Sequence, residues 1–259
     1  MIKILSVGNS FAQDAQKYVP AIAAADGIEI MTGNLFIGGC SLETHWRHAK
    51  ADAKEYWYHV NDNFVKMAAI QEVLMEEDWD YVTFQQSSGL SGIAKSYQPF
   101  LNKLSKYVKT LSPQSTQLIH QTWAYEIDST HGDFLNYDCD QKKMFDGILL
   151  AYEKAALAIG ENDTPAGVIP CGVAIQLARS QPLFDYANGG VSLCRDGFHA
   201  HFTLGRYLLG AVWYEFLTGH SILENSYVPF DPEFPYEISA EELAVLKKCA
   251  HDSYCQKNA

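Results

Sequence analysis

The sequence is poor in basic residues and has no long apolar run. Lys and Arg number 19 against 31 Asp and Glu, which gives a formal net charge of −12. Nucleic acid and anionic membrane surfaces need clustered cations on the protein, so we expect neither partner. No apolar run approaches the roughly 20 residues that span a bilayer. A small molecule that is neutral or weakly charged suits this composition better.

Closely spaced cysteines are also missing. The six cysteines are scattered, without a C-x-x-C pair, and this predicts reduced thiols rather than a disulfide framework. A strand pattern starts at Ile2, which leaves no room for a signal peptide. We therefore expect a cytoplasmic protein; the alternative is an exported protein whose signal peptide is absent from this sequence.

Linkers, internal repeats, G-x-G-x-x-G and P-loop motifs are absent as well. With 47% hydrophobic and 13% aromatic residues, 259 residues can bury one large core. We expect a single domain over residues 1–259, with the tail 225–259 packed on it. The sequence does not indicate the oligomeric state.

Strand and helix patterns alternate, which predicts an α/β fold with a central parallel five-stranded sheet. The short apolar segments predict strands at Ile2–Val7, Glu29–Phe36, Tyr81–Gln85, Gln117–Gln121 and Gly167–Ile169. Helical periodicity covers Ala15–Ala25, Phe64–Glu76, Gln98–Thr110, Gln141–Ile159, Gly172–Ala178, Phe202–Leu217 and Ala240–Cys249. Ligands of such sheets bind beyond the carboxyl ends of the strands. The residues at those ends are Ser10, Gly38-Gly39, Gln85-Gln86 and Trp123.

Ser10 stands where the first strand turns into a helix. A serine hydroxyl needs a base to remove its proton and N–H groups to hold the developing oxyanion. A turn from strand to helix exposes the serine and supplies such N–H groups. Gly8 permits the tight turn. The alternative is that Ser10 only caps the helix.

Asp196 and His199 form an Asp-x-x-His motif near the end of the chain. A carboxylate on one imidazole nitrogen fixes the tautomer, and the other nitrogen can then accept a proton from Ser10. The alternative is an N-cap Asp and a surface His before the next helix.

Together these segments resemble the SGNH/GDSL hydrolase superfamily, and the likeness spans roughly residues 2–217. Its members carry a Ser block after the first strand, a Gly after the second, an Asn after the third and a late Asp-x-x-His. The likeness is closest to a little-characterised bacterial branch with Gly-Asn-Ser-Phe at the Ser block. The resemblance implies a three-layer, flavodoxin-like fold and ester hydrolysis through an acyl-serine, without metal or cofactor.

By position, the resemblance makes Ser10 the nucleophile, His199 the base and Asp196 its orienting group. The oxyanion donors are then the backbone N–H groups of Ser10 and Gly39, with Gly38 as a weaker alternative. The third block departs from the pattern, because Gln85-Gln86 stands in place of the Asn. Since a Gln amide can donate the same hydrogen bond, Gln86 is our preferred third donor, with Gln85 as the alternative. We expect Gly38, Gln85 and Trp123 to contact substrate.

The resulting expectation is a serine esterase, and the Gln block and nearby aromatic residues favour an acetyl ester of a sugar. Three alternatives remain, namely a lipase or thioesterase of the same type, a catalytically degenerate carbohydrate-binding module, and a flavodoxin-like cofactor protein. The partner would be a small-molecule or oligosaccharide ester.

Other segments have ordinary explanations. Gly160-Glu161-Asn162-Asp163 imitates the family's Asn block but follows a helix, where Gly is a common cap. His45 and His48 fit a solvated helix face better than a zinc site. We interpret Asp14 as a polar residue in the first helical turn. Arg195 is expected to form a salt bridge with an acidic residue. The aromatic residues Trp46, Tyr56, Trp57 and Tyr58 suit packing, a lid or a sugar-binding wall.

Overall fold

The computed structural model describes residues 1–161 and 164–258, with side chains to residue 256. Asn162 and Asp163 of the imitated Asn block lie outside the described residues. The chain divides into two compact units. The first comprises Met1–Gln13, Ile30–Thr122 and Asp146–Val168, and the second Asp14–Glu29, Trp123–Phe145 and Ile169–Ala259. The single domain expected for residues 1–259 stays a prediction.

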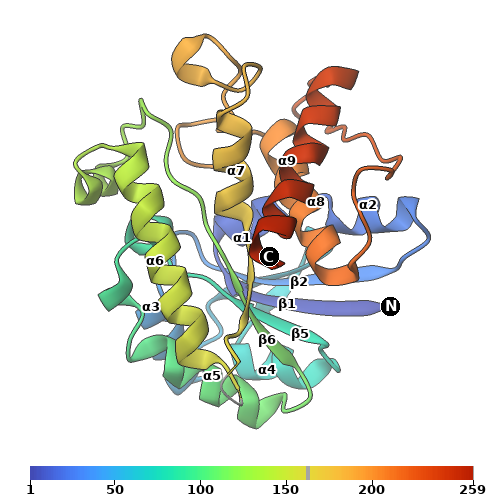
Figure 1. The fold of residues 1–259 in the computed structure, drawn as a ribbon. Helices are drawn as coiled ribbons and strands as arrows, with labels where there is room; N and C mark the ends of the chain where they lie inside the picture. The colour runs from blue at the N-terminus through green and yellow to red at the C-terminus, as the bar shows by residue number, and fades with distance from the viewer. Residues whose placement is uncertain (162–163, 259) are drawn as a thin grey trace. The chain divides into compact units, whose positions relative to one another are not determined.

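A seven-stranded sheet belongs to the first unit, apart from the last residue of β7. Its strands are β1 (Ile2–Gly8), β2 (Ile30–Phe36), β3 (Tyr56–Val60), β4 (Asn63–Ala68), β5 (Tyr81–Phe84), β6 (Thr116–His120) and β7 (Gly167–Ile169). They lie in the order β4-β3-β2-β1-β5-β6-β7, and β1 pairs in parallel with β2 and β5 (Figure 1). The segment β2-β1-β5-β6-β7 has the strand order of flavodoxin-like folds. All five predicted strands are confirmed to within two residues.

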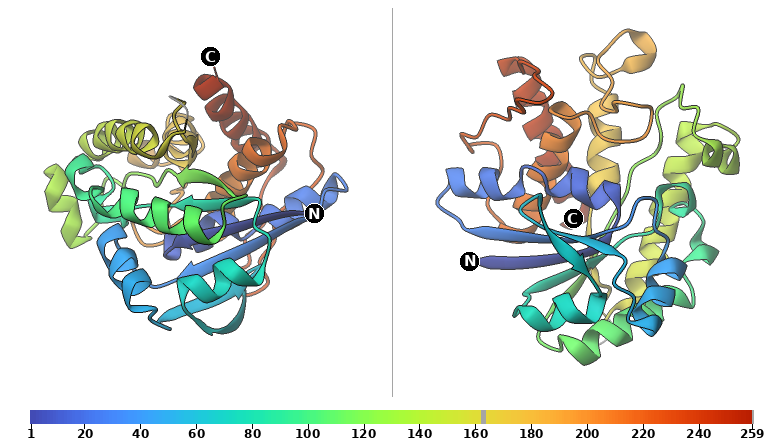
Figure 2. Two further views of the ribbon diagram at one scale, coloured as in Figure 1. Left: turned by 90° about the horizontal axis from the view of Figure 1, so that it is seen from below. Right: turned by 180° about the vertical axis from the view of Figure 1, so that it is seen from behind.

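The prediction of a purely parallel, five-stranded sheet was wrong, because β3 and β4 add an antiparallel hairpin beyond β2 (Figure 2). The sheet is therefore mixed. The hairpin turn, Asn61-Asp62, has φ angles of 48° and 64°. Two consecutive positive φ angles are typical of the turn that joins tight hairpins, which sequences usually mark with Asn-Gly. The predicted helix Phe64–Glu76 is instead β4 followed by a short helix.

In the first unit, α3 (Leu42–Ala51), α4 (Ile70–Glu76) and α5 (Phe100–Leu111) pack against one another. Ser41 caps α3 by accepting a hydrogen bond of 3.3 Å from the Thr44 N–H. The expected solvated face of α3 is wrong for His45, which is fully buried. Its Nδ1 lies 2.8 Å from the hydroxyl of Tyr56, and the two rings stack at 5.6 Å. Burial lowers the pKa of His45 to about 3.

The second unit is helical around α8 (Leu204–Thr218), which is apolar on nearly every side and almost entirely buried. The helices α2 (Val19–Ala25), α7 (Cys171–Arg179) and α9 (Ala240–Asn258) pack against α8, so the tail 225–259 belongs to this unit. The predicted helix Ala15–Ala25 is two helices, α1 (Ser10–Gln16) and α2. Pro20 in the first turn of α2 has no N–H for a continuous helix, which explains the break.

The remaining long helix, α6 (Gln141–Ile159), matches its predicted bounds and ends just before Gly160. The six cysteines all lie in the described part of the chain and are free thiols, as predicted. None of the helices within residues 1–161 and 164–258 has the length and apolar character needed to cross a membrane.

Candidate active site

Three of the predicted site segments follow adjacent strands of the first unit. Ser10 follows β1, Gly38-Gly39 follows β2 and Gln85-Gln86 follows β5. Because β1 pairs in parallel with both neighbours, these segments meet at one edge of the sheet. The strand order reverses between β1 and β5, and ligands of open α/β sheets bind at such a switch point.

Position 8 needs a glycine because a side chain does not fit there, and not because the backbone adopts a conformation that only glycine favours. Its φ is not among the positive values, so the turn does not depend on a glycine conformation. A Cβ at position 8 would lie 2.8 Å from Ala12 Cβ and 3.3 Å from Gln85 Oε1. The missing side chain therefore lets the first turn of α1 lie close to β1.

The buried side chain of Asn9 connects three of the loops at this edge. Its Oδ1 accepts hydrogen bonds from Phe11 N–H (3.0 Å) and Gln85 Nε2, and its Nδ2 donates to the Cys40 carbonyl at 3.2 Å. Gln85 Oε1 lies 2.8 Å from His120 Nδ1, at the end of β6. We call Asn9, Gln85 and His120 the amide network. Sequence reasoning missed Asn9, although it stands directly before Ser10.

Gly38 and Gly39 form an exposed turn after β2. The Cys40 N–H donates to the Ile37 carbonyl at 3.2 Å, and Gly39 has a φ of 62°, which favours glycine. A Cβ on either glycine would meet no atom within 4 Å among the described residues. The backbone of this turn is therefore open to a ligand.

Gln86 is tied into its own loop. Its Oε1 accepts from Leu42 N–H and Ser87 N–H at 3.0 and 2.9 Å, and its Nε2 lies 3.0 Å from both the carbonyl and the hydroxyl of Ser96. Both N–H groups of the amide are therefore in use. These bonds weigh against Gln86 as an oxyanion donor, and that role stays a prediction.

In the second unit, Asp196 and His199 form a hydrogen-bonded pair. His199 Nδ1 lies 2.7 Å from Asp196 Oδ2, and the His199 N–H donates to Asp196 Oδ1 at 2.7 Å. Burial raises the pKa of Asp196, but the hydrogen bonds from His199 outweigh burial and hold it below the usual 3.8. The carboxylate is therefore ionised near neutral pH. Asp196 does not cap the next helix, because α8 begins only at Leu204.

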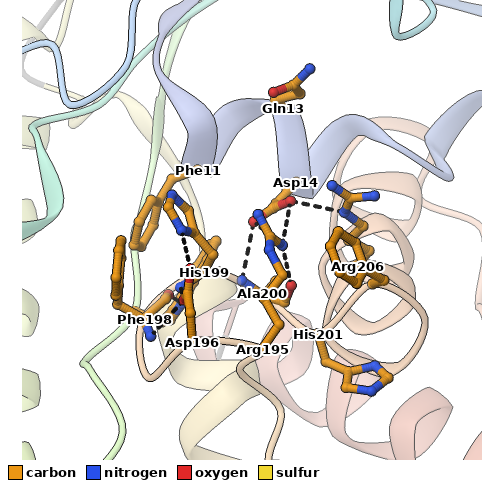
Figure 3. A network of polar contacts seen from close by, with 12 residues as sticks. Phe11, Gln13, Asp14, Arg195, Asp196, Phe198, His199, Ala200, His201 and Arg206 are labelled. Atoms are coloured by element: carbon orange, nitrogen blue, oxygen red, sulfur yellow. Dashed lines mark hydrogen bonds and ion pairs between the residues drawn. The ribbon is translucent and has the colours of Figure 1, made fainter. Parts of the chain in front are cut away.

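Ion pairs with one buried carboxylate hold the loop that carries this pair. Asp14 is 1% exposed and contacts Arg195 Nη1 at 3.0 Å and Arg206 Nε at 2.8 Å (Figure 3). Its Oδ2 also accepts the Ala200 N–H at 3.1 Å. Both guanidinium groups lie over the Phe202 ring, at 4.5 and 4.8 Å. We call Asp14, Arg195 and Arg206 the ionic clamp.

Trp123 also contacts the loop that carries Asp196 and His199. Its side chain is fully buried, and its indole N–H donates to the Phe198 carbonyl at 2.8 Å. The Glu126 N–H adds a bond of 2.7 Å to the Gly197 carbonyl. These contacts hold the loop of Asp196 and His199, and the substrate contact expected of Trp123 stays a prediction.

Comparison with known proteins identifies the family. The model of the domain of unknown function DUF4886 matches residues 3–253. The chain belongs to the DUF4886 family. A DUF4886 protein from Bacteroides uniformis, solved by crystallography, is 35% identical, with a TM-score of 0.89 over 100% of this chain and 96% of that one. Searching the curated proteins gave no match.

Two more distant structures share the fold of this DUF4886 protein. A carbohydrate esterase family 3 protein from Talaromyces cellulolyticus is 12% identical, with a TM-score of 0.51 over 85% of this chain and 97% of that one. A putative GDSL-like lipase from Parabacteroides merdae is 14% identical, with a TM-score of 0.50 over 83% and 94%. The fold is thus an α/β fold similar to that of SGNH hydrolases, with a mixed sheet.

Proposed function

We propose that this DUF4886 protein is a serine esterase in which Ser10 is the nucleophile, His199 the base and Asp196 its orienting group. The observation that carries the proposal is the 2.7 Å hydrogen bond between Asp196 and His199 Nδ1. A neutral imidazole that donates its Nδ1 proton presents Nε2 as the base. The fold similarity to SGNH hydrolases agrees with this chemistry.

Helix α1 supports Ser10 as the nucleophile. Ser10 is its first residue, where backbone N–H groups lack partners within the helix and the dipole favours negative charge. Asp14 follows one turn later in the same helix and holds Ala200, the residue after His199.

In the proposed reaction, Ser10 Oγ attacks the ester carbonyl carbon while its proton passes to His199 Nε2. The negative oxygen of the tetrahedral intermediate is held by the backbone N–H groups of Ser10 and Gly39. His199 then gives the proton to the leaving alcohol, and an acyl-serine remains. Water, deprotonated by His199, then attacks this acyl group. The bond to Ser10 Oγ breaks, His199 returns its proton to Ser10, and the acid leaves.

The finer proposal is that the acyl group is an acetyl group on a sugar. It rests on the Gln85-Gln86 block and on the aromatic residues near the sheet edge. A lipase or thioesterase of the same type would instead prefer long acyl chains. Comparing p-nitrophenyl acetate with p-nitrophenyl octanoate, and measuring acetate release from acetylated oligosaccharides, separates these substrates.

The test of an activated serine is intact mass after treatment with a fluorophosphonate. We expect one adduct on the wild type, none on Ser10→Ala, and an unchanged adduct on Ser180→Ala, at an exposed serine of the second unit. Ser10→Ala should lower kcat for p-nitrophenyl acetate by about 10³-fold or more. An adduct that persists in folded Ser10→Ala would rule out Ser10.

The occupied amide of Gln86 favours one second candidate, a carbohydrate-binding module that has lost catalysis. This candidate predicts sugar binding, but no adduct on a folded wild-type protein and no turnover of p-nitrophenyl acetate. The mass measurement, paired with this activity assay, therefore decides between the two.

A further inference from the structure

Exposed aromatic side chains cover part of the sheet in the first unit. Trp57 on β3 is 55% exposed, and Phe64 and Met67 on β4 are 53% and 41% exposed. The rings of Trp57 and Phe64 are 5.5 Å apart, and His59 lies 5.8 Å from Phe64 and 6.1 Å from Phe36. We call Phe36, Trp57, Phe64 and Met67 the aromatic platform.

The platform lies on the face of the hairpin opposite α3 and α4. Tyr56 and Tyr58, on either side of Trp57, are buried, and Tyr56 stacks on His45 of α3. Lys66, opposite Tyr58 in the register, forms ion pairs with two glutamates of α4. Because side chains alternate along a strand, Trp57 points to the other face.

The platform begins beside the carboxyl end of β1. In the register, Phe36 is paired with Gly8 on one side and with Trp57 on the other. Neighbouring strands are about 4.8 Å apart, so the backbone of Trp57 lies about 10 Å from that of Gly8. Ser10 follows Gly8 by two residues. A short oligosaccharide spans this separation.

The hairpin that carries the platform is anchored at its turn. The Thr32 N–H of β2 donates to Asn61 Oδ1 at 2.9 Å, and Gln13 Nε2 of α1 donates to Asp62 Oδ1 at 3.3 Å. The platform is therefore fixed to β2 and to the helix that begins with Ser10. A surface held in place before binding needs little ordering when a ligand arrives.

We propose that the aromatic platform binds a neutral sugar ring in the alcohol half of the substrate. This inference rests on the proposed esterase function and names its substrate class. The C–H face of a pyranose is apolar and stacks on the negative face of an aromatic ring. The net charge of −12 disfavours anionic sugars such as uronates.

The size of the platform favours a small ligand over a second copy of the chain. Its three exposed side chains, Trp57, Phe64 and Met67, have areas of about 150–250 Å² each and are about half exposed, so they offer roughly 300 Å². A stable protein interface needs about 800 Å² on each partner. Stacking of one or two sugar rings fits the smaller area.

The kinetic test compares Trp57→Ala and Phe64→Ala on two substrates, acetylated xylooligosaccharides and p-nitrophenyl acetate. We expect each variant to raise KM for the oligosaccharide about tenfold, and to leave kcat and the p-nitrophenyl acetate kinetics within about twofold. The control is Met75→Ala, an apolar residue of α4 that is 66% exposed. It should change neither substrate. Equal losses on both substrates would overturn the proposal.

A binding test separates the platform from catalysis. Xylotetraose titrated into Ser10→Ala should bind, and Trp57→Ala in the same background should weaken binding about tenfold. Binding without turnover in the wild type would support the platform and reject the esterase. Turnover of p-nitrophenyl acetate without binding of xylotetraose or cellotetraose would reject the platform alone. A wild-type dimer that Trp57→Ala converts to monomer would show that the face joins two copies, which also overturns the proposal.

Discussion

At the sheet edge that carries Ser10, neutral amides and an imidazole hold the backbone, whereas ion pairs hold the loop that carries His199. In the amide network, Asn9 and Gln85 each use both an acceptor and a donor, and no formal charge is buried. In the ionic clamp, the carboxylate of Asp14 faces two guanidinium groups. Each unit thus positions its part of the candidate site with a different chemistry.

This difference determines how mutations should affect the stability of each region. A neutral network loses hydrogen bonds one at a time, and each removal costs about 1–3 kcal/mol when a buried partner is left unpaired. An ion pair out of contact with water is costly to break, because the remaining charge has no compensation. We therefore expect the loss of one side chain to destabilise the loop that carries His199 more than the sheet edge that carries Ser10.

The largest effect should follow from Asp14→Ala. It leaves Arg195 and Arg206 without their carboxylate, and we expect unfolding to become easier by about 3–5 kcal/mol. Urea unfolding at pH 7 measures this change. The control is Asp252→Asn, which breaks the exposed pair with Lys248 and should cost less than about 1 kcal/mol. Similar losses in the two variants would show that the ionic clamp stabilises the protein no more than an exposed ion pair does.

Two buried asparagines of the first unit should respond in opposite ways. Asn9→Ala removes bonds to three loops and should cost about 2–3 kcal/mol. The amide of Asn34 is 4% exposed and has no hydrogen-bond partner among the described residues. Asn34→Leu should therefore be neutral or stabilising. Thermal unfolding of both variants tests this, and a clear loss of stability in Asn34→Leu would show that its amide has an essential partner.

The last prediction concerns the dependence of stability on acid. Burial lowers the pKa of His120 to about 3, against an ordinary value of 6.5, so the unfolded chain binds more protons between these values. Stability should therefore fall as the pH drops from about 6.5, by up to about 1.4 kcal/mol per pH unit for this group. Urea unfolding at pH 7 and pH 5 should show a smaller loss for His120→Gln than for the wild type. The matched control is His220→Gln, at an exposed position, and identical pH dependence in the wild type and His120→Gln would contradict the assignment.

The sequence predicted the parallel strands because each is a short apolar segment that is buried on both faces. It failed at the hairpin for two local reasons. Asn61-Asp62 lacks the glycine that usually marks such a turn. The apolar residues Phe64, Met67 and Ala68 have the spacing of a helix face, yet they lie on a half-exposed edge strand.

In the candidate site, short-range contacts were predictable and long-range ones were not. Asp196 and His199 are three residues apart, so their pairing follows from the motif. Asp14 meets Arg195 and Arg206 across 181 and 192 residues. The sequence indicated that Arg195 pairs with an acid, but not that this acid is Asp14. Asp14 was therefore interpreted as an ordinary residue of the first turn. The hydrogen bonds of Gln86 were hidden for the same reason.

The contact between Gly8 and Ala12 sets a rule for how related sequences can differ. A Cβ at position 8 would lie only 2.8 Å from Ala12 Cβ, so without a shift of the backbone only one of the two positions can carry a side chain. A relative with alanine at position 8 should carry glycine at position 12, or else shift its first helix away from the strand. The two residues are therefore expected to vary together, so this pair of positions can distinguish true homologues from chains that merely contain a Gly-x-Ser string.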